Sequence, residues 1–225
     1  MEDTEIINLW KSYGKKLDEN LLLNRKNAEA ITKMKVQSLL SSMKPLKIFI
    51  MLGGVVWVCF VDNLIINLFH KASLFFLVSA GIQVLLTQLA IGIYLYQLIL
   101  INRVNVSEPV LATQEKLSRL KSSTLWVARL LFLQLPLWTT YYLSGSMLER
   151  GNVWLYTIQI IVTLLFTCLA IWLFLNIKYA NRDKNWFRLI FPGKILQPVI
   201  KSIELLNQID EYKIENKAVN ENASD

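Results

Sequence analysis

The stretch that decides the fold is residues 23–61, where "LNRKNAEAITKMKVQSLLSSMKPLK" (23–47) runs directly into "IFIMLGGVVWVCFV" (48–61). The first part is basic and has apolar residues at helical spacing. The second part opens an uncharged apolar run that is too long for a core strand and is typical of a membrane span. The sequence therefore joins a positively charged helix to the start of a predicted transmembrane helix.

Three further apolar runs follow the first, so that the four runs cover residues 48–69, 73–101, 125–148 and 154–177. Each has the roughly 20 residues that a helix needs to cross the bilayer. The whole chain is 54% hydrophobic and only 18% charged, against about 25% charged in soluble domains. We expect an all-α, polytopic membrane protein whose four transmembrane helices form two hairpins within residues 48–177.

Basic residues indicate the orientation of the four spans. Nine Lys and Arg residues lie in the segment 1–47, four in the loop 102–124 and eight in the tail 178–225, but the two short turns contain only Lys71 and Arg150. The positive-inside rule then places both termini and the loop 102–124 in the cytoplasm. We expect the end of the tail to be disordered.

Three polar residues within the spans are candidate functional sites, because polar groups at membrane depth are costly. Asp62 lies near the outer end of the first span, where it is either hydrated at the interface or part of an ion or proton site. Arg129 lies near the inner start of the third span, and we expect its side chain to reach the headgroups. Gln159 shares a helical face with Thr163 and Thr167, which favours hydrogen bonds between helices over a transport pathway.

Cysteine, histidine and catalytic motifs give no sign of an enzyme. Cys59 and Cys168 both fall within apolar runs, so we expect inert, packed thiols and no disulfide framework. His70 is the only histidine, so no cluster has the ligand spacing of a metal site. We therefore predict a protein that is not an enzyme and has no metal or cofactor.

The N-terminal segment 1–47 carries the predicted partner-binding surface. Apolar residues follow one another at three- and four-residue steps, as on one face of a helix; they are Ile6, Leu9, Trp10, Tyr13 and Leu17, with Ile31 further along. We expect one helix from Ile6 and a second over residues 21–43, with Pro45 at the boundary of the first span. This face is predicted to bind a cytoplasmic protein.

A second interpretation of the cytoplasmic segments is attachment to the lipid surface. The residues predicted to contact lipid are basic or aromatic; they are Lys33, Lys35, Lys44, Trp186 and Arg188. The seam formed by Val199, Ile203, Leu206 and Ile209 in the tail indicates a helix that packs on its neighbours. Nucleic-acid binding is not expected, because acidic residues are interspersed with the basic ones.

Four stretches carry a resemblance to a known family: "NLW", "LLLNRKNAEAITKMKVQSLLSSMK", "PVLATQEKLSRLK" and "SIELLNQIDEY". Together they resemble a family of small membrane proteins of Bacteroidota that are regarded as companions of extracytoplasmic-function sigma factors. The resemblance implies a membrane-tethered anti-sigma factor of the bacterial inner membrane, whose segment 5–43 holds the sigma factor. The alternatives are an accessory subunit of a membrane complex, including a homo-oligomer, and a small transporter.

Overall fold

The computed structural model describes residues 2–104, 108–143, 153–191, 193 and 195–222. Regular structure in these residues is helical throughout, which confirms the predicted all-α class. The helices are α1 (Glu2–Ser41), α2 (Lys44–Leu68), α3 (Leu74–Arg103), α4 (Val110–Phe132), α5 (Leu135–Thr140), α7 (Val153–Asn176), the short 3₁₀ helix η1 (Tyr179–Asn181), α8 (Asn185–Ile190) and α9 (Gln197–Asn222).

Three helical stretches are long and apolar enough to cross a membrane. They are Glu5–Leu68, which joins α1 to the apolar α2, then α3, and then α7. The first, second and fourth apolar runs of the sequence are therefore helices of spanning length.

The third apolar run is divided between two helices. α4 ends at Phe132, and α5 begins at Leu135 with Pro136 in its first turn. Proline lacks an N–H group, and its ring excludes the carbonyl group four residues earlier, which in this chain belongs to Phe132. From the sequence we expect Pro136 to kink the third span, and the structure has a break of the helix there. Residues 144–148 of the predicted span lie outside the described residues.

The N-terminal segment forms one 40-residue helix, not the two that we expect from the sequence. Gly14, which we expect to weaken the first helix, lies within α1 without interrupting it. A glycine costs only about 1 kcal/mol in a helix relative to alanine, and no proline follows it before Pro45. α1 stops just before Pro45, which occupies the first turn of α2.

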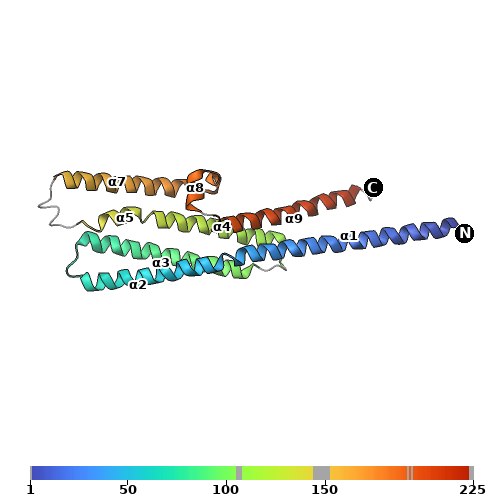
Figure 1. The fold of residues 1–225 in the computed structure, drawn as a ribbon, viewed down its shortest axis with the longest axis horizontal. Coiled ribbons are helices and arrows are strands. Elements are labelled where there is room, and N and C mark those ends of the chain that lie inside the picture. Colours follow the sequence, from blue (N-terminus) through green and yellow to red (C-terminus); the bar gives the residue numbers. More distant parts are fainter. Residues whose placement is uncertain (1, 105–107, 144–152, 192, 194, 223–225) are drawn as a thin grey trace.

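The helices are arranged as a body with two projecting arms (Figure 1). α2, α3, α4 with α5, and α7 lie side by side along the long axis of the molecule. α1 and α9 leave the same end of this body, so both arms point in one direction. α1 continues almost in line with α2, away from the body.

Apolar packing is concentrated where the arms meet the body. Val36 and Leu40 of α1, Leu117 and Leu120 of α4, and Leu206 of α9 belong to one buried cluster. The seam predicted in the tail is thus a packing surface, with Val199 and Ile209 in the same cluster and Ile203 packed against it. Helix α9 reaches Asn222, so it includes most of the tail.

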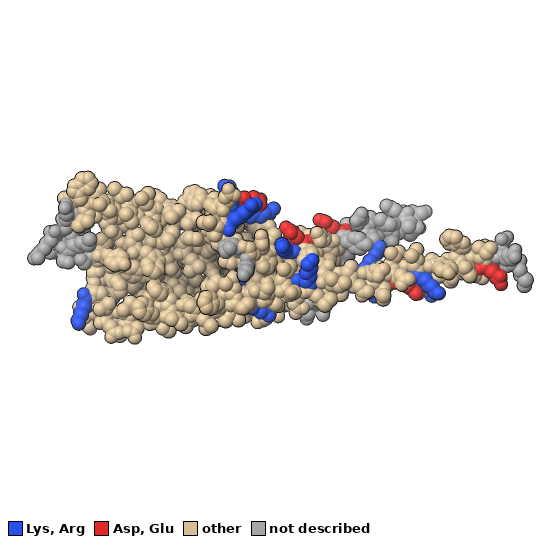
Figure 2. Space-filling model, viewed as in Figure 1, with Lys and Arg blue, Asp and Glu red and all other residues tan. Residues whose placement is uncertain are grey.

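Charge is almost confined to the end of the body that bears the arms. Figure 2 shows a wide uncharged surface over the body, a small basic area at the far end, and charged side chains where the arms begin and along them. Asp62 is the one ionisable Asp, Glu, Lys or Arg between residues 48 and 68, and α7 has none. An uncharged helical body of this kind suits the hydrocarbon of a bilayer.

The two cysteines are exposed on the outside of the body, which corrects the expectation of packed thiols. Cys59 of α2 and Cys168 of α7 face away from the neighbouring helices. An apolar run shows depth in the membrane but does not show which side of its helix is covered, so the sequence alone gave no basis for the difference.

Candidate partner-binding site

The projecting segment, which we define as residues 5–24 of α1, presents an uncovered apolar face. Every side chain in this segment is exposed, and Trp10 is 76% exposed. The predicted face Ile6, Leu9, Trp10, Tyr13 and Leu17 is therefore accessible along its whole length. Ile31, beyond the segment, is exposed as well.

The apolar face ends where α1 meets α9. Val36 is 2% exposed, and Leu40 is buried against the same cluster of α4 and α9 side chains. Between Glu5 and Val36 the helix advances by roughly 45 Å at 1.5 Å per residue. The candidate site is thus a long helical arm held at its base.

The direction of α1 relative to the body distinguishes a partner-binding helix from a lipid-surface anchor. A helix that anchors a protein to lipid lies in the plane of the interface. α1 instead runs along the same axis as the helices of the body (Figure 1). If the body spans a bilayer, the projecting segment points away from the membrane surface, and its apolar residues have no lipid to cover them.

The predicted lipid-surface residues have mixed surroundings. Lys33 forms an ion pair with Glu29 one turn earlier, with 3.0 Å between Nζ and Oε1. Lys35 and Arg188 are exposed, and Lys44 is half-buried. Trp186 is half-buried, and its ring packs against Trp172 with 4.9 Å between ring centroids.

The Arg129 side chain binds the backbone at the end of α7. Its Nε and Nη2 atoms donate to the Ile177 carbonyl oxygen at 2.9 and 2.6 Å. Its guanidinium group also lies over the Trp126 ring, 5.2 Å from the centroid. A cation at the carboxyl end of a helix satisfies an unpaired carbonyl group and stabilises the helix dipole.

Gln159 bonds across helices as its position in the sequence predicts. Its Nε2 atom donates to the backbone oxygen of Thr139 in α5, and the Thr139 hydroxyl donates to the Thr163 hydroxyl of α7 at 3.1 Å. Asp62 is half-buried near the end of α2, and no described side chain forms an ion pair with it. Gln159 thus takes part in hydrogen bonds between helices, whereas Asp62 forms no ion pair within the described residues.

Sequence reasoning missed a buried cation at the base of the arm. Lys47 is 3% exposed, donates to Oε1 of Gln97 in α3, and lies over the Tyr94 ring. Lys47 directly precedes the first apolar run, so it counts as one more basic residue of the N-terminal segment. One feature of the sequence could have indicated this pair: Gln97 is a polar residue near the end of the second apolar run, and a helical hairpin brings that end close to the start of the first run, where Lys47 lies.

A second group of buried polar residues joins α3 to the broken third run. The Ser79 and Thr140 hydroxyl groups are 2.7 Å apart, and Gln134 Nε2 donates to the Thr87 hydroxyl at 3.1 Å. Gln83, between them on α3, is 1% exposed, and its amide has no partner among the described residues. Such bonds hold helices together in an apolar environment.

Metal-binding chemistry has no support in the described part of the chain, where no three His, Cys, Asp or Glu residues form a group. No protein-family model, curated protein or solved structure matches the chain. The resemblance to companions of sigma factors therefore stays a prediction.

Proposed function

We propose that this chain is a non-enzymatic membrane protein that binds a cytoplasmic protein partner through the projecting segment of α1. The observation that supports the proposal is a fully exposed face of apolar side chains on a helix directed away from the body. A contiguous apolar face of this kind is uncommon on a free protein surface and marks an interaction site. An amphipathic helix that fills a groove of its partner uses residues at this spacing.

The proposal includes four spans in two hairpins. The third span comprises α4 from Leu125 onward and α5, within the apolar run 125–148 of the sequence. Its support is that α4 and α5 contact α3 on one side and α7 on the other, as a member of the same bundle does. A break at Pro136 is compatible with a span, because neighbouring helices can satisfy the freed backbone groups.

Both termini lie on the cytoplasmic side of the bacterial inner membrane in this proposal. The support is the excess of Lys and Arg at the end of the body that bears the arms (Figure 2). The projecting segment then extends into the cytoplasm, where it holds its partner at a distance from the membrane surface.

The partner class to test first is a sigma factor, which would make the chain an anti-sigma factor. The support for this choice is the family resemblance of the N-terminal stretches. An exposed apolar helix would also suit the alternative function, in which this chain is an accessory subunit of a larger membrane complex. The experiment must therefore distinguish a cytoplasmic partner from a membrane-embedded one.

The experiment places a photo-crosslinking amino acid at position 10 or at position 15 of the full-length protein in its native cell. Lys15 is nine residues after Ile6, which is two and a half turns, so it lies on the opposite face. We expect position 10, but not position 15, to capture a cytoplasmic protein, which mass spectrometry then identifies.

Three outcomes have distinct meanings. Capture of a sigma factor at position 10 alone supports the proposal in its specific form, and capture of another cytoplasmic protein supports partner binding and contradicts the anti-sigma role. Capture of membrane subunits or lipid alone contradicts the proposal and favours the accessory subunit or the lipid anchor.

A further inference from the structure

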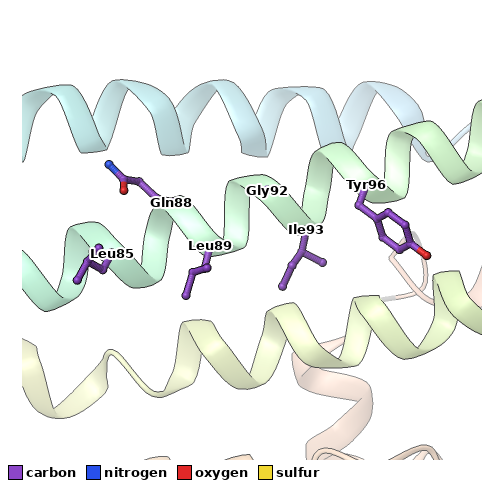
Figure 3. Close-up of a pocket in the computed structure, with 6 residues that line it drawn as sticks. All are labelled: Leu85, Gln88, Leu89, Gly92, Ile93 and Tyr96. Carbon is purple, nitrogen blue, oxygen red and sulfur yellow. The ribbon is translucent and has the colours of Figure 1, made fainter.

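One lateral face of α3 carries an apolar groove along the part of the helix that is long and apolar enough to span a membrane. Figure 3 shows the groove, in which Leu85, Leu89 and Ile93 extend from successive turns of α3 toward the side of α4 and α5. Its volume is about 440 Å³, and Gln88, Gly92 and Tyr96 complete its lining. The lining residues span 12 positions, or roughly 16 Å along the helix, in a size range that accommodates small ligands.

Gly92 keeps this groove open. A Cβ atom at position 92 would have no neighbouring atom within 4 Å. The space beside the backbone is therefore unfilled by the chain itself. In a bilayer, hydrocarbon would occupy it, because the lining is almost entirely apolar.

The groove continues into a second hollow, whose lining surface is also mainly apolar but which is bordered by polar side chains of α4. This hollow, of about 360 Å³, shares Ile93 and Tyr96 with the groove and adds residues of α4; these are Arg119, Ser122, Ser123 and Trp126. It lies toward the end of α3 where the charged side chains begin. Trp126 is exposed there, as is typical of aromatic residues at the level of lipid headgroups.

Two side chains of opposite charge, Arg119 and Glu115 of α4, lie at the end of the hollow away from the groove. Arg119 Nη2 is 2.7 Å from Glu115 Oε1, and both side chains are more than half exposed. The hydrogen bond that Arg119 donates to Glu115, and then its interaction with Tyr96, raise the pKa of Arg119 above its ordinary value, so its guanidinium group stays charged. Glu115 is one turn further from the groove than Arg119 along α4.

We propose that the groove and the neighbouring hollow together bind one phospholipid whose headgroup carries a primary amine. An acyl chain lies against Leu89, Gly92 and Ile93, and the phosphate accepts hydrogen bonds from Arg119 at the edge of the hollow. The ammonium group, which follows the phosphate in such a lipid, donates to the Glu115 carboxylate.

The arrangement of Arg119 before Glu115 matches a headgroup in which an anionic phosphate is followed by an ammonium group, and this favours an amine-containing phospholipid over other lipids. A glycerol headgroup has no cation for Glu115, and a choline headgroup has no N–H group to donate. A second copy of this chain would supply an apolar helix to the groove but no matched pair of phosphate and ammonium. An exposed ion pair such as Arg119–Glu115 is weak, so the lipid headgroup replaces it at little cost.

The experiment is native mass spectrometry of the full-length protein, released from mild detergent, with added phosphatidylethanolamine, phosphatidylglycerol or phosphatidylcholine. We expect phosphatidylethanolamine to bind up to about fivefold more tightly than the other two, since an exposed charge pair with Glu115 contributes no more than about this factor. Glu115→Gln should remove this preference, and Glu204→Gln, at an exposed position of α9, should retain it.

A second pair of variants tests the groove itself. Gly92→Leu fills the groove and should abolish the binding of phosphatidylethanolamine, whereas Gly53→Leu, in equally open space on α2, should not. Equal binding of the three lipids by the unmodified chain, equal losses in the two leucine variants, or a mass of two chains without lipid would each overturn the proposal.

Discussion

The two ends of α1 have the same kind of apolar spacing and opposite surroundings. The covered segment, residues 36–41, is packed against α4 and α9 through Val36 and Leu40. The projecting segment, residues 5–24, contacts solvent with every side chain. Because both belong to one helix, the difference teaches that periodicity specifies an apolar face but does not specify what covers it.

The covered segment should account for stability and the projecting segment should not. Leu40→Ala removes a fully buried side chain and should lower the free energy of unfolding by about 2–5 kcal/mol. Leu17→Ala, the matched change at an exposed position, should alter it by less than about 0.5 kcal/mol. Thermal unfolding in detergent, followed by tryptophan fluorescence, measures both. Equal losses in the two variants would show that the projecting segment is covered in the folded protein.

The projecting segment should instead account for partner binding. Trp10→Ala removes the most exposed aromatic residue of the predicted face and should weaken the partner's affinity by about 2 kcal/mol, roughly 30-fold. The same variant should unfold at the same temperature as the unmodified protein. Surface plasmon resonance with immobilised full-length protein measures the affinity once photo-crosslinking has identified the partner. Unchanged affinity would remove Trp10 from the interface.

Lys47 lies at the boundary between the arm and the body. Variants of Lys47 and its partner Gln97 therefore test the stability of this junction, beside the covered and the projecting segments of α1. Gln97→Leu leaves the buried Lys47 side chain without its acceptor and should cost about 1–3 kcal/mol of stability. Lys47→Met removes the cation together with its need for an acceptor, and should cost less or stabilise the protein. Unfolding temperatures of both variants and of the double variant test this order. A larger loss for Lys47→Met would mean that the pair itself stabilises the junction.

The helical character of the chain follows from the sequence, because the apolar runs are long and nearly uncharged. The break at the third run also follows from a single residue, Pro136, through the hydrogen bond that it cannot make. The pairing of Lys47 with Gln97 does not follow, since it joins residues 50 positions apart on two helices. The exposure of Cys59 does not follow either, because an apolar environment and an apolar packing partner select the same residues.

The predicted site shows the same division. The apolar face from Ile6 to Leu17 is legible in the sequence, and its exposure is not, because Val36 and Leu40 have comparable spacing and become buried. What separates them is α9, whose seam from Val199 to Ile209 meets the covered segment. A pattern within one helix does not contain the position of another.

The smallest expected effect concerns the stiffness of the arm. Gly14 lies within the projecting segment, and a Cβ atom there would meet no neighbouring atom within 4 Å. Gly14→Ala should therefore stabilise the helix locally by about 0.5–1 kcal/mol without changing any contact. Hydrogen exchange of the amides on either side of position 14 should slow, while exchange in the covered segment, already protected by packing, should stay the same. If a partner binds the arm as a helix, its affinity should rise, because less ordering remains to be done on binding. Slower exchange with weaker binding would mean that the partner requires the arm to bend at Gly14.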